Sequence, residues 1–336
     1  MTIQLLFFFL FFSAKASASA VGVCYGRVAN NLLPPTQVVN LVKLNGITKV
    51  RLFDADPTVL QAFSGSGVSL MIGVPNEILP DLASGGPAAA SYWLQNSLFA
   101  HIQADQIRYL AVGNEIFYKD TFYTPYLVPA MRNLYQVLQS LNLAETIKIS
   151  SPHAASVLTR AFPPSNGAFD PFILPTMQSL LQFLSETGAP FMVNVYPFFS
   201  YVNNLKDIPL QYALFNSTGV VQDNGFVYDN LYDATIDAFV YAMEKEGFGG
   251  IPVSVTETGW PTSGGAVAQP ENAMVYNSNI VRRALANVGT PKRPGVGVEA
   301  FLFGLFDENE KEGGDYEKHF GIFSNQGAKV YDINFS

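Results

Sequence analysis

Hydrophobic residues along the chain gather in short, nearly continuous runs. Eight such runs, rich in Val, Ile, Leu and Phe, lie at 21–25, 49–53, 69–74, 107–112, 148–151, 191–196, 252–255 and 299–305. Runs without apolar–polar alternation are typical of strands buried on both faces. The runs therefore predict a parallel sheet of eight strands.

The segments between the runs show helical periodicity. Apolar residues recur every three or four positions in five of them, at 35–44, 126–141, 174–184, 231–245 and 271–286, which is typical of helices packed on a core. Strands alternating with helices predict a single-domain α/β fold, a (β/α)8 (TIM) barrel. The segment 202–230 is expected to lie outside the repeat.

An open, doubly wound sheet is the structural alternative. It normally carries a glycine-rich phosphate-binding turn after its first strand, and residues 26–29 (Gly-Arg-Val-Ala) are not such a turn.

The N-terminal segment is expected to be separate from the fold. An apolar run at 5–12 is followed by the small residues Ala18-Ser19-Ala20, and this run is too short to cross a bilayer of about 30 Å. We predict a cleaved signal peptide, 1–20, and one barrel domain, 21–336; a buried strand is the alternative. Asn216-Ser217-Thr218 is a candidate N-glycosylation site. The C-terminus shows no lipid-anchor signal, so we expect no membrane anchor.

Composition excludes several classes of function. The net charge is −8 and the pI is near 4.9, which argues against a nucleic-acid partner. The single cysteine, Cys24, rules out a disulfide scaffold and is expected to be an inert, packed thiol. The three histidines lie far apart in the sequence, so we expect no metal and no cofactor.

Two glutamates are the main candidates for chemistry. Glu115 follows the fourth apolar run and Glu257 follows the seventh, and active sites of such barrels lie at the carboxyl ends of the strands. Either glutamate alone could form a strand-end ion pair. Together, on strands that face each other across the barrel mouth, they favour glycoside hydrolysis with retention, which needs carboxyls about 5–5.5 Å apart. Glu115 would be the acid/base and Glu257 the nucleophile.

Several motifs in the mature region point to a known family. They are Val21-Gly-Val-Cys-Tyr-Gly26, Val50-Arg-Leu-Phe-Asp54, Val112-Gly-Asn-Glu115, Asn194-Val-Tyr-Pro197, Val255-Thr-Glu-Thr-Gly-Trp-Pro-Thr262, Phe306-Asp-Glu-Asn-Glu-Lys311 and His319-Phe-Gly-Ile-Phe323. In this order they resemble the plant β-1,3-glucanases of glycoside hydrolase family 17. The resemblance implies a (β/α)8 fold, retaining endohydrolysis of 1,3-β-glucan, no metal, and the same roles for Glu115 and Glu257.

The resemblance also implies supporting residues. Asn114 stands where related glycosidases bond the sugar 2-hydroxyl, although an ordinary turn asparagine is the alternative. Glu308, Lys311 and Glu317 match charged residues that the family places around the catalytic pair. Lys311 would keep Glu257 ionised by lowering its pKa. Without the resemblance, residues 307–312 would be interpreted as a solvated run of charges.

Other side chains at strand ends have two interpretations each. Tyr25, Tyr196 and Trp260 are candidates to stack on sugar rings, with barrel packing as the alternative. Phe198, Phe199 and Tyr201 could extend that platform or pack in the core. His153 could line the cleft, but a structural histidine is favoured. Arg51 and Asp54 are expected to form an ion pair inside the barrel.

Three functions remain open from the sequence. The favoured one is a secreted endo-1,3-β-glucanase that acts on callose or on fungal wall glucan. A mixed-linkage endo-1,3;1,4-β-glucanase and a non-catalytic glucan-binding protein are the alternatives. We expect a monomer whose partner is β-glucan, located in the cell wall, with the vacuole as the alternative location.

Overall fold

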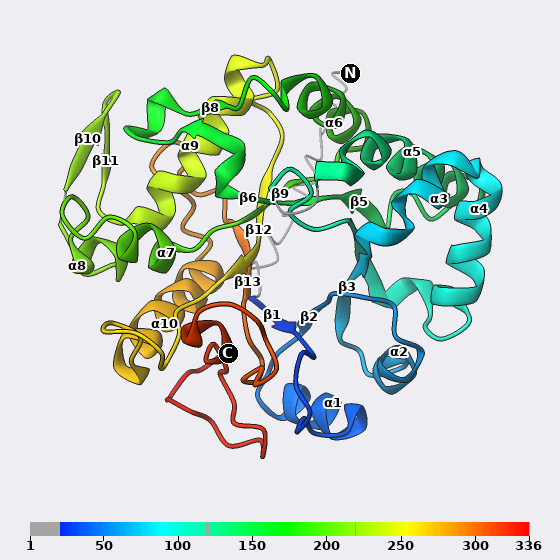
Figure 1. The fold of residues 1–336 in the computed structure, drawn as a ribbon, viewed down its shortest axis with the longest axis horizontal. Coiled ribbons are helices and arrows are strands. Elements are labelled where there is room, and N and C mark those ends of the chain that lie inside the picture. The colour runs from blue at the N-terminus through cyan, green and yellow to red at the C-terminus, as the bar shows by residue number, and fades with distance from the viewer. Residues whose placement is uncertain (1–20, 119–120, 219, 336) are drawn as a thin grey trace, which may run out of the picture.

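The structure is a computed structural model that describes residues 21–118, 121–218 and 220–335, and its centre is a parallel β-barrel (Figure 1). The strands follow the order β5-β4-β3-β2-β1-β13-β12-β9-β6. Their bounds are β1 Gly22–Tyr25, β2 Lys49–Leu52, β3 Ser69–Val74, β4 Ile107–Val112, β5 Lys148–Ser150, β6 Pro152–Ala154, β9 Phe191–Asn194, β12 Val253–Thr258 and β13 Glu299–Leu302.

The first and last strands in this order, β5 and β6, are consecutive in the sequence. Only Ser151 separates β5, which pairs with β4, from β6, which pairs with β9. The nine strands therefore correspond to the eight predicted runs, and the barrel is nearly closed. This confirms the predicted (β/α)8 barrel, and the open doubly wound sheet is wrong. The predicted signal peptide, 1–20, lies outside the described residues.

The first four strands agree with the predicted runs to within one residue at each end. The sixth run was expected to reach Tyr196, but β9 ends at Asn194. The seventh run was expected to end at Val255, but β12 continues to Thr258 with a bulge in its pairing to β9, so Glu257 belongs to the strand. The eighth was expected to reach Leu305, but β13 ends at Leu302. Apolar character predicts burial, and residues 303–305 are buried without being paired in a strand.

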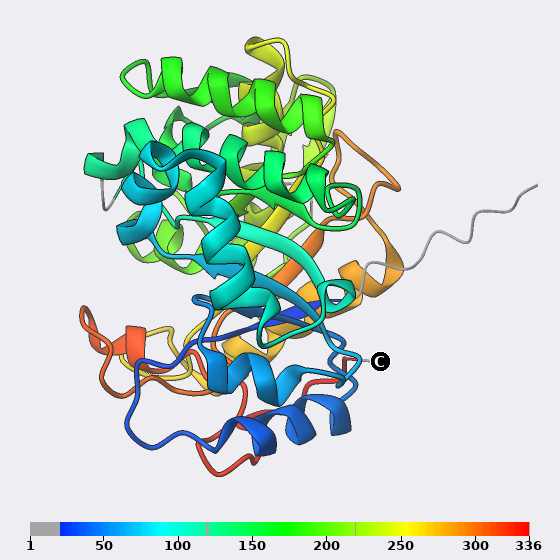
Figure 2. The same ribbon diagram turned by 90° about the vertical axis from the view of Figure 1, so that its right-hand side faces the viewer.

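Helices surround the barrel (Figure 2). Those predicted from periodicity are present as α1 Pro35–Leu44, α5 Leu127–Ser140, α6 Leu174–Thr187, α9 Leu231–Lys245 and α10 Pro270–Ala286. Five shorter helices were not predicted: α2 Pro57–Phe63, α3 Leu79–Ser84, α4 Gly86–Trp93, α7 Pro197–Val202 and α8 Leu210–Ala213. Each has at most about two turns, too few for a helical period to be evident.

The segment 202–230 lies outside the barrel sheet, as predicted. It contains α8 and an antiparallel hairpin of β10 Val221–Asp223 and β11 Phe226–Tyr228, at the left of Figure 1. A second small hairpin, β7 Leu158–Arg160 with β8 Ala168–Phe169, precedes α6. Among the residues that the structure describes, none of the helices has the length and apolar character needed to cross a membrane.

Candidate active site

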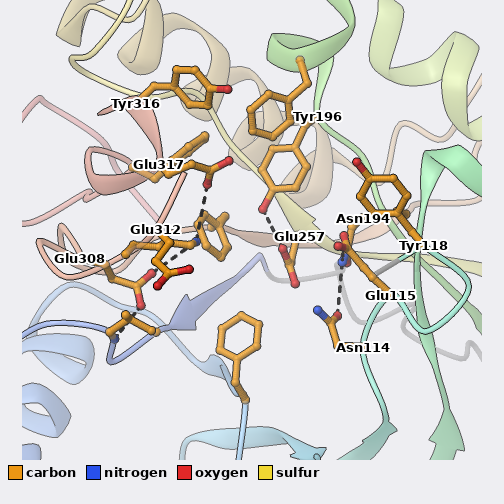
Figure 3. A pocket seen from close by; sticks show the side chains of 18 of the residues that line it. Asn114, Glu115, Tyr118, Asn194, Tyr196, Glu257, Glu308, Glu312, Tyr316 and Glu317 are labelled. Carbon is orange, nitrogen blue, oxygen red and sulfur yellow. Dashed lines mark hydrogen bonds and ion pairs between the residues drawn. The ribbon is translucent and has the colours of Figure 1, made fainter. Parts of the chain in front are cut away.

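A cleft of about 960 Å³ opens at the carboxyl ends of the strands. Eight of the nine predicted site residues line it: Tyr25, Asn114, Glu115, Tyr196, Glu257, Glu308, Lys311 and Glu317. Figure 3 shows Glu257 and Tyr196 in the middle, Glu308 and Glu317 on one side, and Asn114 and Glu115 on the other. Residues from opposite ends of the chain thus meet in one cavity.

The turn after β4 directs Glu115 into the cleft. Both Gly113 (φ 65°) and Glu115 (φ 52°) are in the left-handed region, which is costly for a glutamate. Hydrogen bonds hold this conformation: the Glu115 N–H donates to the Pro152 carbonyl at 2.9 Å, and the Asn114 N–H donates to Asn76 Oδ1 at 2.8 Å. A strained, well-supported residue of this kind is typical of functional sites.

Glu257 projects from the bulged part of β12 and accepts two strong hydrogen bonds. Arg51 Nη1 donates to its Oε1 at 2.7 Å, and the Tyr196 hydroxyl donates to its Oε2 at 2.8 Å. The Arg51 side chain is buried, and its Nη2 donates to Asn114 Oδ1 at 2.9 Å. One guanidinium from β2 therefore connects the two strand ends that carry the glutamates.

The expected ion pair of Arg51 with Asp54 is wrong. Asp54 lies beyond the end of β2 and pairs with Arg27 at 3.3 Å instead. Successive strand residues point to opposite faces, and Arg51 points into the barrel, where Glu257 is the carboxylate within reach.

Asn194, the last residue of β9, links Glu115 to Arg51, which in turn contacts Glu257. Its Nδ2 donates to Glu115 Oε1 at 2.9 Å, while its Oδ1 accepts from Thr256 Oγ1 at 2.8 Å and from Arg51 Nη1 at 3.4 Å. The path Glu115–Asn194–Arg51–Glu257 is thus a chain of hydrogen bonds across the floor of the cleft.

Burial raises the pKa of Glu257 above its usual value, because it disfavours the charged form. The Arg51 cation opposes this effect most strongly, the negative charge of Glu115 adds to it, and the Tyr196 hydroxyl and Lys311 oppose it more weakly. Lys311 lowers the pKa of Glu257, as expected, but Arg51 is the cation in direct contact and has the larger effect.

Lys311 instead organises a group of charges at the edge of the cleft. Its Nζ lies 3.7 Å from Glu308 Oε2 and 3.8 Å from Glu317 Oε2, and 4.0 Å from the centre of the Phe303 ring. Glu308 also accepts from the Val28 N–H at 2.9 Å. Residues 307–312 are therefore not simply a solvated run of charges.

The aromatic candidates separate into two groups. Tyr25, Tyr196 and Phe199 line the cleft. Trp260 does not: its side chain is fully buried, packs against Phe198 and donates from Nε1 to the Val267 carbonyl at 2.8 Å. The prediction that Trp260 presents a face to sugar is wrong, because the chain after β12 turns it into the core.

The remaining candidates lie away from the cleft. Phe198 and Tyr201 pack near Trp260. His153 is fully buried between the rings of Phe117 and Phe191, each 5.2 Å away.

Two further predictions concern single residues. Cys24 is buried in β1, where its thiol donates to the Thr256 carbonyl, and burial raises its pKa far above the usual value, as expected for an inert thiol. Asn216 is exposed at the surface.

Sequence reasoning missed several residues of the cleft. They include Asn194, Tyr118, Glu312, Phe303, Tyr316 and Phe320. The contact of the buried Arg51 with Glu257 was also not predicted. A signal was available for Asn194, because a polar residue ends an otherwise apolar strand. No local signal marked Phe303, whose apolar side chain is indistinguishable in sequence from core residues, and Phe320 belongs to a quoted motif that did not indicate its place in the cleft.

Among the described residues, no group of three or more His, Cys, Asp or Glu side chains is arranged to hold a metal ion. The fold and the site together define a barrel with two buried glutamates at strand ends in an open cleft, an arrangement typical of glycosidases. The model of the glycosyl hydrolases family 17 matches residues 21–335, and the chain belongs to this family.

Two plant relatives are similar to the chain over nearly their full length. The chain is 40% identical to a glucan endo-1,3-beta-glucosidase of Vitis vinifera over 99% of this chain and 97% of the relative. It is 43% identical to an acidic glucan endo-1,3-beta-glucosidase of Zea mays over 97% and 94%. The solved structure of CJP38, a beta-1,3-glucanase and allergen of Cryptomeria japonica pollen, matches with a TM-score of 0.90 and 43% identity, covering 94% and 99% of the two chains.

Proposed function

We propose that the protein is a retaining endohydrolase of 1,3-β-D-glucan in which Glu257 is the nucleophile and Glu115 is the acid/base. The observation that carries this proposal is the environment of the two carboxyls. Glu257 contacts a guanidinium and a phenol hydroxyl, which both favour a carboxylate, whereas Glu115 contacts the neutral amide of Asn194. Different surroundings of this kind give two carboxyls different roles.

The first step forms a glycosyl-enzyme. Glu257 attacks the anomeric carbon of the sugar at the cleavage point, the glycosidic C–O bond breaks, and Glu115 delivers its proton to the departing oxygen. Arg51 and Tyr196 hold Glu257 in place for this attack. Asn114, fixed by Arg51, is positioned to bond the 2-hydroxyl of the sugar.

The second step reverses the first with water. Glu115, now ionised, removes a proton from a water molecule, whose oxygen attacks the anomeric carbon and displaces the Glu257 carboxylate. Two inversions give net retention. The cleft is open rather than enclosed by the described residues, and its size fits several sugar units of a polymer cut internally.

Two substitutions test the assignment. Glu257→Gln should abolish turnover of every glucan. Glu115→Gln should reduce hydrolysis of the polymer by about 10²–10⁴-fold but spare an activated aryl glycoside, because a good leaving group needs little protonation. Initial rates on linear 1,3-glucan and on the aryl glycoside measure both effects, with Glu271→Gln on the exposed face of α10 as the control. Near-normal polymer activity in both variants would refute the site.

The products distinguish the alternatives. Proton NMR of the first product should show the β-anomer, and an initial α-anomer would overturn retention. Comparing products from linear 1,3-glucan and from mixed 1,3;1,4-glucan separates the favoured substrate from the alternative one, and binding without hydrolysis of either would indicate a glucan-binding protein.

Secretion to the cell wall is the second part of the proposal. The signal-like residues 1–20 and the exposed Asn216 of the sequon support passage through the secretory pathway. Expression in a eukaryotic host should yield a chain that begins at Val21. It should also carry a glycan that disappears in Asn216→Gln, which mass spectrometry of the intact protein can detect.

A further inference from the structure

We propose that Asn194 is a positioning residue that determines which oxygen of Glu115 carries the transferable proton. The inference rests on the proposed function, in which Glu115 is the acid/base. Asn194 is 2% exposed. Its side-chain amide lies between the carboxyl group of Glu115 and the guanidinium of Arg51, which contacts Glu257. Both polar atoms of its side chain are engaged by protein groups, the nitrogen by Glu115 and the oxygen by Thr256, so we assign its effect on the reaction to Glu115 rather than to direct contact with substrate.

The orientation of the Asn194 amide follows from its neighbours. A guanidinium can only donate hydrogen bonds, so the amide atom that faces Arg51 must be the oxygen. The Thr256 hydroxyl donates to the same oxygen at 2.8 Å. With Oδ1 held by two donors, the NH2 group must face Glu115, where it donates to Oε1 at 2.9 Å.

This orientation determines which oxygen of the Glu115 carboxyl group carries the proton when the group is protonated. A carboxylic acid has one hydroxyl oxygen and one carbonyl oxygen, and the carbonyl oxygen is the better acceptor. Because Asn194 donates to Oε1, that oxygen is the carbonyl and the proton resides on Oε2. When the proton has been transferred, the same bond to Oε1 persists, so Oε2 is again the oxygen that receives a proton from water.

One test separates this role from a general structural one. Asn194→Leu keeps the side-chain volume but removes the donor. Relative to the wild type, kcat/KM on linear 1,3-glucan should fall about 10²-fold, the lower range for loss of general acid catalysis. On a dinitrophenyl glycoside, whose leaving group needs no proton, it should change by less than about threefold.

Azide supplies an independent signature. In the second step azide attacks the anomeric carbon, forms a C–N bond and displaces the Glu257 carboxylate, and it has no proton to lose. Azide should therefore raise kcat of Asn194→Leu on the dinitrophenyl glycoside and yield a β-glycosyl azide. The wild type, whose acid/base is correctly protonated, should show no such increase.

Thr256 and Thr258 provide a matched pair on the same strand. Both are fully buried, but Thr256 donates to Asn194 whereas the Thr258 hydroxyl contacts that of Tyr276 at 2.6 Å. Thr256→Val should show the same leaving-group-dependent loss as Asn194→Leu, although smaller, and Thr256→Ser should restore much of it. Thr258→Val should lower stability without any dependence on the leaving group.

A 2-deoxy-2-fluoroglycoside should form a long-lived covalent bond to Glu257, so the fraction of labelled protein measures the fraction of intact active sites. If the wild type is not labelled there, the proposed function itself fails. If it is labelled and the rate of Asn194→Leu per labelled site falls equally on both substrates, only the role of Asn194 is overturned. If Asn194→Leu does not fold, the threonine pair decides: equal effects of Thr256→Val and Thr258→Val on the two substrates overturn the proposal.

Discussion

For single residues, the key quantity in the site is the pKa of Glu257, which burial raises and neighbouring groups lower. Burial alone would favour the protonated form, which cannot act as a nucleophile. Arg51 and the Tyr196 hydroxyl both favour the carboxylate and limit the rise in its pKa. The ionised fraction of Glu257 at acidic pH is thus set by neighbours on other strands.

Tyr196→Phe tests this balance. It removes the 2.8 Å hydrogen bond to Glu257 Oε2, a contact that lowers the pKa of Glu257. Without it that pKa should rise further, so activity should be lost at a higher pH as the solution is acidified. A hydrogen bond to a charged group of about 1.5–3 kcal/mol corresponds to a shift of about one unit or more.

The measurement is the pH profile of kcat/KM on the acidic side. Tyr316→Phe is the control, because Tyr316 lines the same cleft and is not among the residues that shift the Glu257 pKa most. An unchanged acidic limb in Tyr196→Phe, or an equal shift in Tyr316→Phe, would contradict the assigned contact.

At the scale of elements, the site is assembled where the end of β1 meets the loop that carries Glu308 and Lys311. The first residue after β1 is Gly26, and a Cβ there would lie 2.6 Å from the carboxyl carbon of Glu308. The absence of a side chain at this position lets the loop approach β1 and lets Glu308 bond the Val28 N–H. The packing of two elements thus depends on one glycine.

Gly26→Ala should therefore destabilise the protein and displace the charged group. We expect a loss of about 1–3 kcal/mol in the free energy of unfolding, the usual cost of overpacking. We also expect reduced activity, because a displaced Glu308 would displace Lys311, its ion-pair partner. Denaturant unfolding and polymer hydrolysis measure the two effects. Gly250→Ala is the control: a Cβ at this position would meet nothing within 4 Å. Equal stabilities of the two variants would contradict the prediction.

For the whole molecule, acid stability reflects buried groups that do not line the cleft. Burial lowers the pKa of His153 to about 3, so the folded protein keeps it neutral. The unfolded chain takes up a proton near pH 6.5. Stability from this group is therefore complete above about pH 6.5 and is lost as the pH falls toward 3, at about 1.4 kcal/mol per pH unit.

Asp233 acts in the opposite direction. Burial raises its pKa to about 6 despite the Arg283 cation beside it. The folded protein therefore binds this proton more readily than the unfolded chain, and stability falls as the pH rises from about 4 to 6. The two groups partly compensate in that range.

His153→Leu isolates the histidine contribution. At pH 7 the variant should be less stable than the wild type because the packing between Phe117 and Phe191 is lost. At pH 4 this difference should shrink by about 3 kcal/mol, since only the wild type loses stability through a neutral buried histidine. Urea unfolding at both pH values measures it, and an identical difference at pH 4 and pH 7 would refute the prediction.

The periodic features of the fold could be predicted from the pattern of apolar and polar residues. Continuous apolar runs predicted the eight strand segments because strands buried on both faces need no polar positions. Helices such as α5 and α9 were predicted because three or more turns display a clear period. The sequence also placed Glu115 and Glu257 at strand ends, where a carboxylate interrupts an apolar pattern.

Which side chains contact one another could not be predicted without the folded structure. Arg51 contacts Glu257 rather than Asp54, Trp260 is buried, and Asn194 connects the two glutamates. These contacts join residues on β2, β9 and β12 whose distance depends on the twist of the barrel and on a bulge at Glu257. The local sequence pattern predicts whether a residue is buried. Which residue it contacts depends on closure of the barrel, because closure brings distant parts of the chain together.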